Sequence, residues 1–135
     1  MMAKNRMKGR RKLCIYLVDD EPTLAEMAEH ILALKDYKAT VFIDPVKALK
    51  QITSRKTKPH LLITDYLMGC MTGLELIEEY KALHPDGKTL LLSGTITGEQ
   101  IDAARVRPDR FLAKPYSAED LLQAVTELVA EIQEA

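Results

Sequence analysis

The stretch from residue 61 to residue 65 reads LLITD, a short apolar run that ends at a carboxylate. A second stretch of the same kind, LCIYLVDD, occupies residues 13–20. Runs that are apolar at nearly every position, and not at every second one, are typical of strands buried on both faces of a parallel sheet. The two stretches therefore predict parallel strands that each end at acidic residues.

The rest of the chain alternates similar runs with amphipathic stretches. Further strands are predicted at residues 39–43, 89–92 and 110–113, and apolar side chains at helical spacing predict a helix after each strand. These helices are expected to begin near Pro22, Asp44-Pro45, Gly73, Gly98 (a helix over about 98–105) and Ser117, with Asp120 completing a capping box for the last. The side chains expected to face the core are Leu24, Ala28, Ile31 and Leu34 in the first helix, Val46, Leu49 and Ile52 in the second, Leu74, Ile77 and Tyr80 in the third, and Leu121, Val125, Leu128 and Ile132 in the last.

Five strand–helix units in strict alternation predict a single α/β domain. Right-handed crossovers between parallel strands place helices on both faces of the sheet, which gives a doubly wound, three-layer α/β/α sandwich. A chain of 135 residues holds five such units and little else. We therefore expect one domain over residues 13–133, preceded by a basic, disordered tail over residues 1–12.

Charge is distributed unevenly between the tail and the predicted domain. The formal net charge is −1, yet residues 1–12 hold six of the 19 basic residues and no acidic one. The remaining 13 basic residues face all 20 acidic ones, so residues 13–135 carry −7. The six basic residues of the tail are Lys4, Arg6, Lys8, Arg10, Arg11 and Lys12. An acidic domain of this kind is not expected to bind nucleic acid directly.

Composition excludes further classes of protein. Hydrophobic residues make up 47% and charged residues 29%, which suits a globular core and excludes a disordered chain. No stretch reaches the roughly 18 apolar residues that a membrane helix needs, and the basic start lacks the apolar run of a secretory signal. Cys14 and Cys70 are expected to be free thiols. These features predict a cytoplasmic protein without a membrane partner.

Polar side chains stand at the carboxyl ends of the predicted strands, where doubly wound sheets bind their ligands. They are Asp19, Asp20 and Glu21 after the first strand, Asp65 after the third, Ser93 after the fourth and Lys114 after the fifth. Two carboxylates about 4 Å apart repel by roughly 4 kcal/mol at an effective dielectric near 20, so a cluster of them favours a hard cation. Mg²⁺ fits best, because it takes oxygen ligands from carboxylates together with phosphate oxygens.

Beside such a cation, the Asp65 carboxylate is a suitable nucleophile toward phosphorus. Ser93 could donate a hydrogen bond to a phosphoryl oxygen, with Gly94 leaving room for it, and Lys114 could supply a positive charge. Taken singly, each of these residues has an ordinary alternative as a helix cap, a turn residue or a surface lysine. A cis bond between Lys114 and Pro115 is expected to aim the lysine inward.

These residues, in this order, resemble the receiver domain of two-component response regulators. The motifs are VDDE at residues 18–21, D-x-x-M-x-x-x-x-G from Asp65 to Gly73, Ser93-Gly94, and FLAKPY at residues 111–116. Each motif alone is weak, but together they are specific and cover residues 13–133. The resemblance implies a flavodoxin-like fold with a five-stranded parallel sheet in the order 2-1-3-4-5.

The resemblance also implies a role for each site residue. Asp65 matches the phospho-acceptor, Lys114 the lysine that pairs with the phosphoryl group, Ser93 the switch hydroxyl and Phe111 the switch aromatic. Asp20 matches the direct Mg²⁺ ligand, Asp19 the acid that acts through water, and the backbone carbonyl of Leu67 a further ligand beside Asp65. The protein would not be an enzyme in the usual sense, because it would catalyse only its own phosphorylation and dephosphorylation.

The same resemblance implies the partners. A sensor histidine kinase or a histidine phosphotransfer protein would donate the phosphoryl group from a phosphohistidine. The surface of the fourth helix, fifth strand and fifth helix would then change, acting on a protein target, on a fused output domain or in a homodimer. Both a stand-alone receiver and a receiver cut from a longer chain are consistent with the sequence.

The sequence departs from the family pattern in two places. Gly69 stands where the family usually has proline, which is expected to loosen the loop, and residues 106–109 (VRPD) replace a frequent Gly-Ala pair. Leu67 and Thr95 match positions that tune loss of the phosphoryl group, and the apolar Leu67 suggests slow hydrolysis. Phe111 lacks the hydroxyl of the frequent tyrosine.

Three rival functions share parts of this pattern. A phosphatase of the haloacid dehalogenase type needs a second acid where this chain has Leu67. A flavodoxin-like cofactor binder needs a phosphate loop where this chain has Asp19, Asp20 and Glu21, which repel phosphate in the absence of a metal. The third is a phosphorylation-independent protein-docking module with a receiver fold. The filled site argues against this module, whereas Gly69 and the unusual fourth-helix region keep it open.

Overall fold

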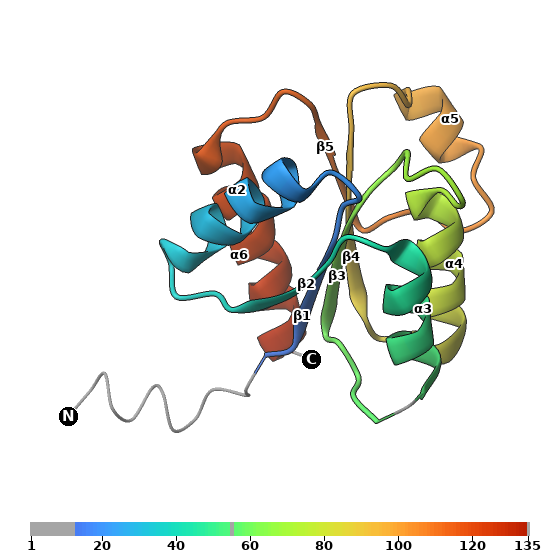
Figure 1. The fold of residues 1–135 in the computed structure, drawn as a ribbon, viewed down its shortest axis with the longest axis horizontal. Helices are drawn as coiled ribbons and strands as arrows, with labels where there is room; N and C mark the ends of the chain where they lie inside the picture. Colours follow the sequence, from blue (N-terminus) through green and yellow to red (C-terminus); the bar gives the residue numbers. More distant parts are fainter. Residues whose placement is uncertain (1–12, 55, 135) are drawn as a thin grey trace.

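The computed structural model describes residues 13–54 and 56–134, which form a five-stranded parallel sheet in the order β2-β1-β3-β4-β5 (Figure 1). This order and the parallel pairing confirm the predicted fold class. The predicted tail over residues 1–12 lies outside the described residues. The strands are β1 (Ile15–Val18), β2 (Ala39–Phe42), β3 (Leu61–Asp65), β4 (Lys88–Ser93) and β5 (Arg110–Ala113).

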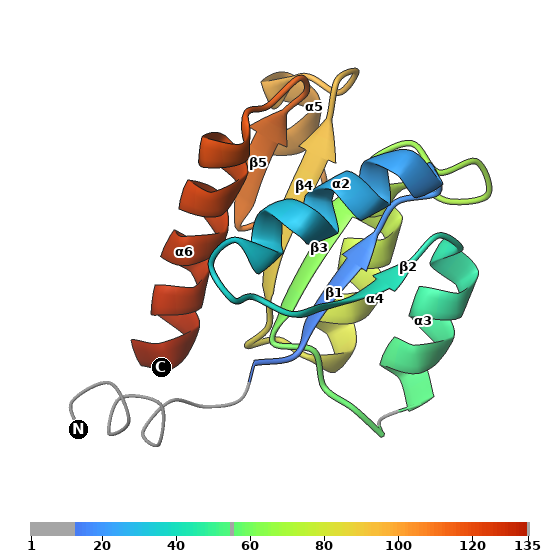
Figure 2. The same ribbon diagram turned by 60° about the vertical axis from the view of Figure 1, so that its left-hand side comes forward.

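Helices cover both faces of the sheet, as the sandwich requires. Helices α2 and α6 lie on one face, and α3, α4 and α5 lie on the other (Figures 1 and 2). The helices are α2 (Pro22–Ala33), α3 (Pro45–Ser54), α4 (Gly73–Leu83), α5 (Gly98–Asp102) and α6 (Ala118–Glu134). The strictly alternating order of strands and helices along the described chain is the predicted one.

Each face of the sheet has its own hydrophobic core, which explains why the central strands are apolar throughout. In β1, Leu17 belongs to the core beneath α2 and α6, whereas its neighbour Val18 belongs to the core beneath α3 and α4. In β3, Ile63 and Leu62 divide between the two cores in the same way. Successive side chains of a strand point to opposite faces, so a strand covered on both sides must be apolar at every position.

The predicted helix stripes are confirmed in α6 and wrong in part of α2 and α3. All four predicted side chains of α6 are buried. In α2, however, Leu24 and Leu34 are 38% and 72% exposed, and in α3 Val46 is 42% exposed. The side chains that α2 does bury are Ala25, Ala28 and Leu32. Small alanines let the helix axis approach the sheet closely, which rotates the neighbouring larger side chains outward, and Leu34 lies beyond the end of the helix.

Capping interactions set the ends of the helices near the carboxyl edge of the sheet. The predicted capping box is confirmed, because the Ser117 hydroxyl accepts the Asp120 N–H and the Asp120 carboxylate accepts the Ser117 N–H. A second box, between Thr97 and Gln100, begins α5. Helix α5 ends at Asp102, so the expected helix over residues 98–105 is three residues too long. Within the described part of the chain, none of the helices has both the length and the apolar character that a membrane crossing requires.

Candidate phosphorylation and metal site

The register of the parallel strands brings the predicted site residues to one edge. Val18 pairs with Thr64, and Ser93 pairs with Ala113, so Asp19, Asp65, Ser93 and Lys114 all lie at the carboxyl ends of neighbouring strands. No helix separates them, because the chain leaves the sheet here through loops. The convergence predicted from the sequence is therefore present in the structure.

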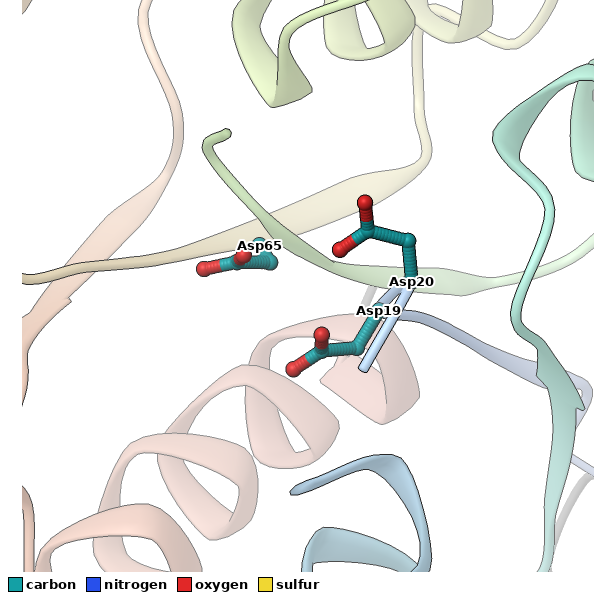
Figure 3. A group of neighbouring side chains, drawn as sticks. All are labelled: Asp19, Asp20 and Asp65. Carbon is teal, nitrogen blue, oxygen red and sulfur yellow. The ribbon is translucent and has the colours of Figure 1, made fainter. Parts of the chain in front are cut away.

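Three carboxylates gather at this edge, and Figure 3 shows them beside the ends of β1 and β3. Asp19, Asp20 and Asp65 each offer an oxygen atom, and these atoms lie within 4.8 Å of one another. Asp19 is buried, Asp65 is half-buried and Asp20 is exposed. An all-oxygen donor set with one face open to solvent fits Mg²⁺, which prefers carboxylates and keeps several of its waters.

Lys114 is the cation that partly balances this cluster. Its Nζ lies 2.9 Å from Asp65 Oδ1 and 3.7 Å from Asp19 Oδ2. Burial lowers the pKa of Lys114, but the hydrogen bond and the charge of Asp65 outweigh it, so that the pKa lies above its usual value. The predicted cis bond between Lys114 and Pro115 is present. Lys114 is therefore held as an ammonium group against the predicted phospho-acceptor.

Asp19 is the most buried of the three acids. Its Oδ1 accepts the backbone N–H of Glu21 at 3.0 Å, and its own N–H donates to the Phe42 carbonyl at 3.0 Å. Burial raises the pKa of the Asp19 carboxyl above its usual value, and the charges of Asp65 and Asp20 add to this effect against the opposing Glu21 N–H and Lys114. Two of the three carboxylates, those of Asp19 and Asp65, thus share the Lys114 ammonium, which leaves negative charge for a cation to neutralise.

The Ser93 hydroxyl is already engaged within its own loop. Its Oγ accepts the N–H groups of Thr95 at 3.0 Å and Ile96 at 3.1 Å, and Ser93 is 3% exposed. It therefore holds the β4–α5 loop closed. A Cβ at Gly94 would lie 3.5 Å from Lys114 Cβ, an ordinary van der Waals distance, so Gly94 lies directly beside the lysine. Phe111 is half-buried in β5 and packs against the core beneath α3 and α4.

The loop from Tyr66 to Thr72 connects the acceptor strand to α4. Gly69 has a φ of 74°, a left-handed conformation that proline cannot adopt. The loop is nevertheless closed by the Gly73 N–H, which donates to the Tyr66 carbonyl at 2.7 Å, and by a bridge between Leu67 and Thr72. Leu67 is 55% exposed.

Sequence reasoning gave no role to two residues that contact the site. Tyr116 belongs to the quoted FLAKPY motif, and burial raises the pKa of its phenol, with Lys114 opposing and Asp19 and Asp65 reinforcing the shift. Thr64 precedes the acceptor and donates its hydroxyl proton to the Asp65 carbonyl at 2.9 Å. A threonine inside a buried, otherwise apolar strand was the available signal.

Known proteins with a similar sequence or fold are receiver domains. The sequence profile described as the response regulator receiver domain matches residues 15–126. Among solved structures, a CheY-like receiver domain protein from Methanospirillum hungatei superposes with a TM-score of 0.80 at 23% identity, covering 92% of this chain and 98% of that one. The receiver domain of NtrX from Brucella abortus superposes with a TM-score of 0.75 at 27% identity, covering 86% and 98%.

Curated relatives extend this likeness to longer proteins. The nitrogen assimilation regulatory protein NtrX from Azorhizobium caulinodans is 35% identical over 120 residues, which are 87% of this chain and 26% of that protein. The probable transcriptional regulatory protein TcrX from Mycobacterium tuberculosis is 27% identical over 118 residues, 87% of this chain and 50% of that protein. The chain thus spans about half, or less, of the relatives it matches.

The five-stranded parallel sheet of order 2-1-3-4-5, with acids and a lysine at its carboxyl edge, has the CheY-like, flavodoxin-like fold of the class of signalling receivers. Within that class, the chain belongs to the response regulator receiver domain family of two-component systems. Membership supports a phosphorylation-dependent signalling role.

Proposed function

We propose that this chain is a phosphorylation switch that accepts a phosphoryl group on Asp65, in the presence of Mg²⁺, from a phosphohistidine donor. The observation that carries the proposal is the cluster of Asp19, Asp20 and Asp65 with Lys114 Nζ 2.9 Å from Asp65 Oδ1. It would act as a substrate of its own reaction and not as an enzyme on other molecules.

In the proposed reaction, an Asp65 carboxylate oxygen attacks phosphorus, an oxygen–phosphorus bond forms, and the phosphorus–nitrogen bond to the donor histidine breaks. The imidazole leaves with the bonding electron pair and takes up a proton. Mg²⁺, held by Asp19, Asp20, Asp65 and the predicted Leu67 carbonyl, would neutralise charge on the phosphoryl oxygens. Lys114, already paired with Asp65, would pair with the phosphoryl group.

The switch would follow from movement of the Ser93 side chain. A phosphoryl group adds about −1.5 to −2 charge and three acceptor oxygens at Asp65. A hydroxyl can donate and accept at the same time, so it is movement of Ser93 toward the phosphoryl group that would stretch the two N–H bonds its Oγ accepts in the β4–α5 loop. We expect that loop to rearrange, with Phe111 repacking, so that the surface of α5, β5 and α6 changes for a target or a second copy.

The surface beside the cluster supports docking of a protein donor. Helix α2 begins directly after Asp20 and Glu21, and it leaves Leu24 and Met27 38% and 55% exposed. Leu67, 55% exposed, follows the acceptor by two residues. We propose that a sensor kinase or a phosphotransfer protein covers this apolar rim.

Because Leu67 cannot itself orient a water molecule, we also propose slow loss of the phosphoryl group. A lifetime of seconds for the phosphorylated protein would contradict this proposal.

Mg²⁺-dependent labelling with a small phosphodonor tests the proposal. We expect label on the wild type, none on Asp65→Asn, and none without Mg²⁺. Asp20→Ala should lose Mg²⁺ binding by calorimetry, whereas Lys114→Ala should retain it and respond poorly to phosphorylation. Glu78→Gln, an exposed acid on α4, is the matched control and should label normally. Equal labelling of wild type and Asp65→Asn would overturn the acceptor assignment, and no labelling of either would favour the phosphorylation-independent docking module.

A further inference from the structure

The Thr64 hydroxyl lies directly beneath the predicted acceptor. Thr64 is fully buried in β3, and its side chain points to the face of the sheet opposite to that of Asp65. Its Oγ1 donates to the Asp65 backbone carbonyl at 2.9 Å and lies 3.6 Å from the Met68 Sδ. A single hydroxyl therefore contacts both the acceptor's own peptide group and the loop that follows.

Met68 is the point at which that loop is fixed to the core. It is 3% exposed, whereas Leu67 and Gly69 on either side are exposed. Its side chain belongs to the core beneath α3 and α4, together with Val18 and Leu91. The loop thus inserts one side chain into the core between two solvent-facing residues, and the Thr64 hydroxyl contacts that side chain.

The same Asp65 carbonyl is confined from its other side by Gly73. A Cβ built on Gly73 would lie 2.2 Å from the Asp65 carbonyl oxygen, so the first turn of α4 packs directly against it. The peptide group after Asp65 therefore lies between the Thr64 hydroxyl and the start of α4. Its orientation determines how the chain leaves β3 toward Leu67.

We infer that Thr64 is a positioning residue for Mg²⁺ binding. Its hydroxyl fixes the Asp65 carbonyl and Met68, and thereby presets the segment that carries the Asp65 carboxylate and the predicted ligand carbonyl of Leu67. The inference rests on the proposed function, because it takes the metal ligands from there. Partners that hold metal ligands in place typically contribute about 10-fold to 100-fold in metal affinity.

Thr64→Val tests the inference, because valine keeps the shape of threonine and removes only the hydrogen bonds. We expect it to raise the Kd for Mg²⁺ about 10-fold in calorimetric titrations, and Thr64→Ser, which keeps the hydroxyl, to restore binding. Thr89→Val is the matched control, since Thr89 is equally buried and hydrogen-bonded at the opposite edge of the sheet. It should lose stability without a change in the Kd.

An unchanged Mg²⁺ affinity in folded Thr64→Val would overturn the inference, and so would an equal loss of affinity in Thr89→Val. If Thr64→Val does not fold, Thr64→Ala serves instead, because alanine also removes the hydroxyl and places no methyl group against the Asp65 carbonyl. Its Kd should rise, and an unchanged value would reject the positioning role. These titrations need no phosphodonor. A wild type that binds Mg²⁺ but takes no label would therefore reject the proposed function alone.

Discussion

Carboxylates are in excess at the carboxyl ends of the strands, whereas acidic and basic side chains are paired at the amino ends. At the carboxyl edge, three carboxylates lie together, two of them pair with Lys114, and burial raises the pKa of Asp19. At the amino edge, Asp109 pairs with Lys81 at 2.9 Å, and Glu131 pairs with Lys88 and Arg110. The hydrogen bond from Lys88, aided by Arg110 and opposed by slight burial, lowers the pKa of Glu131.

The difference separates a structural network from a functional one. Asp109 also accepts the N–H and the hydroxyl of Thr89, and its own N–H donates back to that hydroxyl. The charges of Asp109, Lys81, Lys88, Arg110 and Glu131 are thus paired within the protein, which favours the folded state. The carboxyl edge holds an excess of one sign, which costs stability until a ligand of the opposite sign binds. We therefore expect substitutions at the two edges to change stability in opposite directions.

The largest expected effect is at the amino edge, in Asp109→Ala. Removal of the carboxylate leaves the Thr89 N–H and hydroxyl without their acceptor in a largely buried position, and Lys81 keeps the Gly87 carbonyl but loses its anionic partner. We expect a loss of about 3 kcal/mol in the free energy of unfolding, measured by urea denaturation. Asp109→Asn keeps an oxygen acceptor for Thr89 and should lose only about 1 kcal/mol. Any change in Mg²⁺ affinity in these variants would contradict the separation of the two edges.

The hydrogen bonds between Asp109 and Thr89 could not be predicted from the sequence. The departure from the family pattern at residues 106–109 was visible in the sequence, but its meaning was not. That Asp109 faces Thr89 depends on where β4 and β5 begin in space, 20 residues apart in the chain. Local apolar patterns carry no information on such long-range pairing of polar side chains.

The fold and the carboxyl edge, by contrast, could be predicted because they follow from simple repeating rules. Runs such as Leu61–Thr64 must be covered on both faces, and parallel strands bring their carboxyl ends together. Helix rotation was less predictable: Leu24 and Leu34 fit a helical stripe, yet α2 buries Ala25 and Leu32. The local pattern did not distinguish close packing through alanine from looser packing through leucine.

An intermediate effect, of opposite sign, is expected for Asp19→Asn at the carboxyl edge. Asparagine keeps an oxygen acceptor for the Glu21 N–H and removes one of three neighbouring negative charges. In the absence of Mg²⁺ at pH 7, we expect the variant to gain about 1 kcal/mol in the free energy of unfolding. In saturating Mg²⁺ the order should reverse, because the ion stabilises the wild type in proportion to its affinity.

The dependence of this gain on pH provides an independent check. The pKa of Asp19 is raised in the folded state above its reference value of 3.8, so its ionised form costs stability at neutral pH. As the pH falls through the folded-state pKa toward 3.8, protonation relieves that cost in the wild type but has no counterpart in Asp19→Asn. The difference between the two proteins should therefore shrink on acidification. A difference that grows instead would contradict the raised pKa.

The smallest effect is expected for Gly69→Ala, in the loop that leaves the carboxyl edge. A Cβ at this position would meet no atom within 4 Å, so the cost is the left-handed φ of 74° alone, about 1 kcal/mol. Gly69→Asn should cost less, because asparagine tolerates this conformation better. Since Met68 fixes the preceding segment to the core, we expect the Kd for Mg²⁺ to stay unchanged in both variants. A weaker Kd in Gly69→Ala would show that the loop beyond Met68 also shapes the metal site, and the boundary between the charged cluster and its scaffold would then lie farther along the chain, toward Thr72.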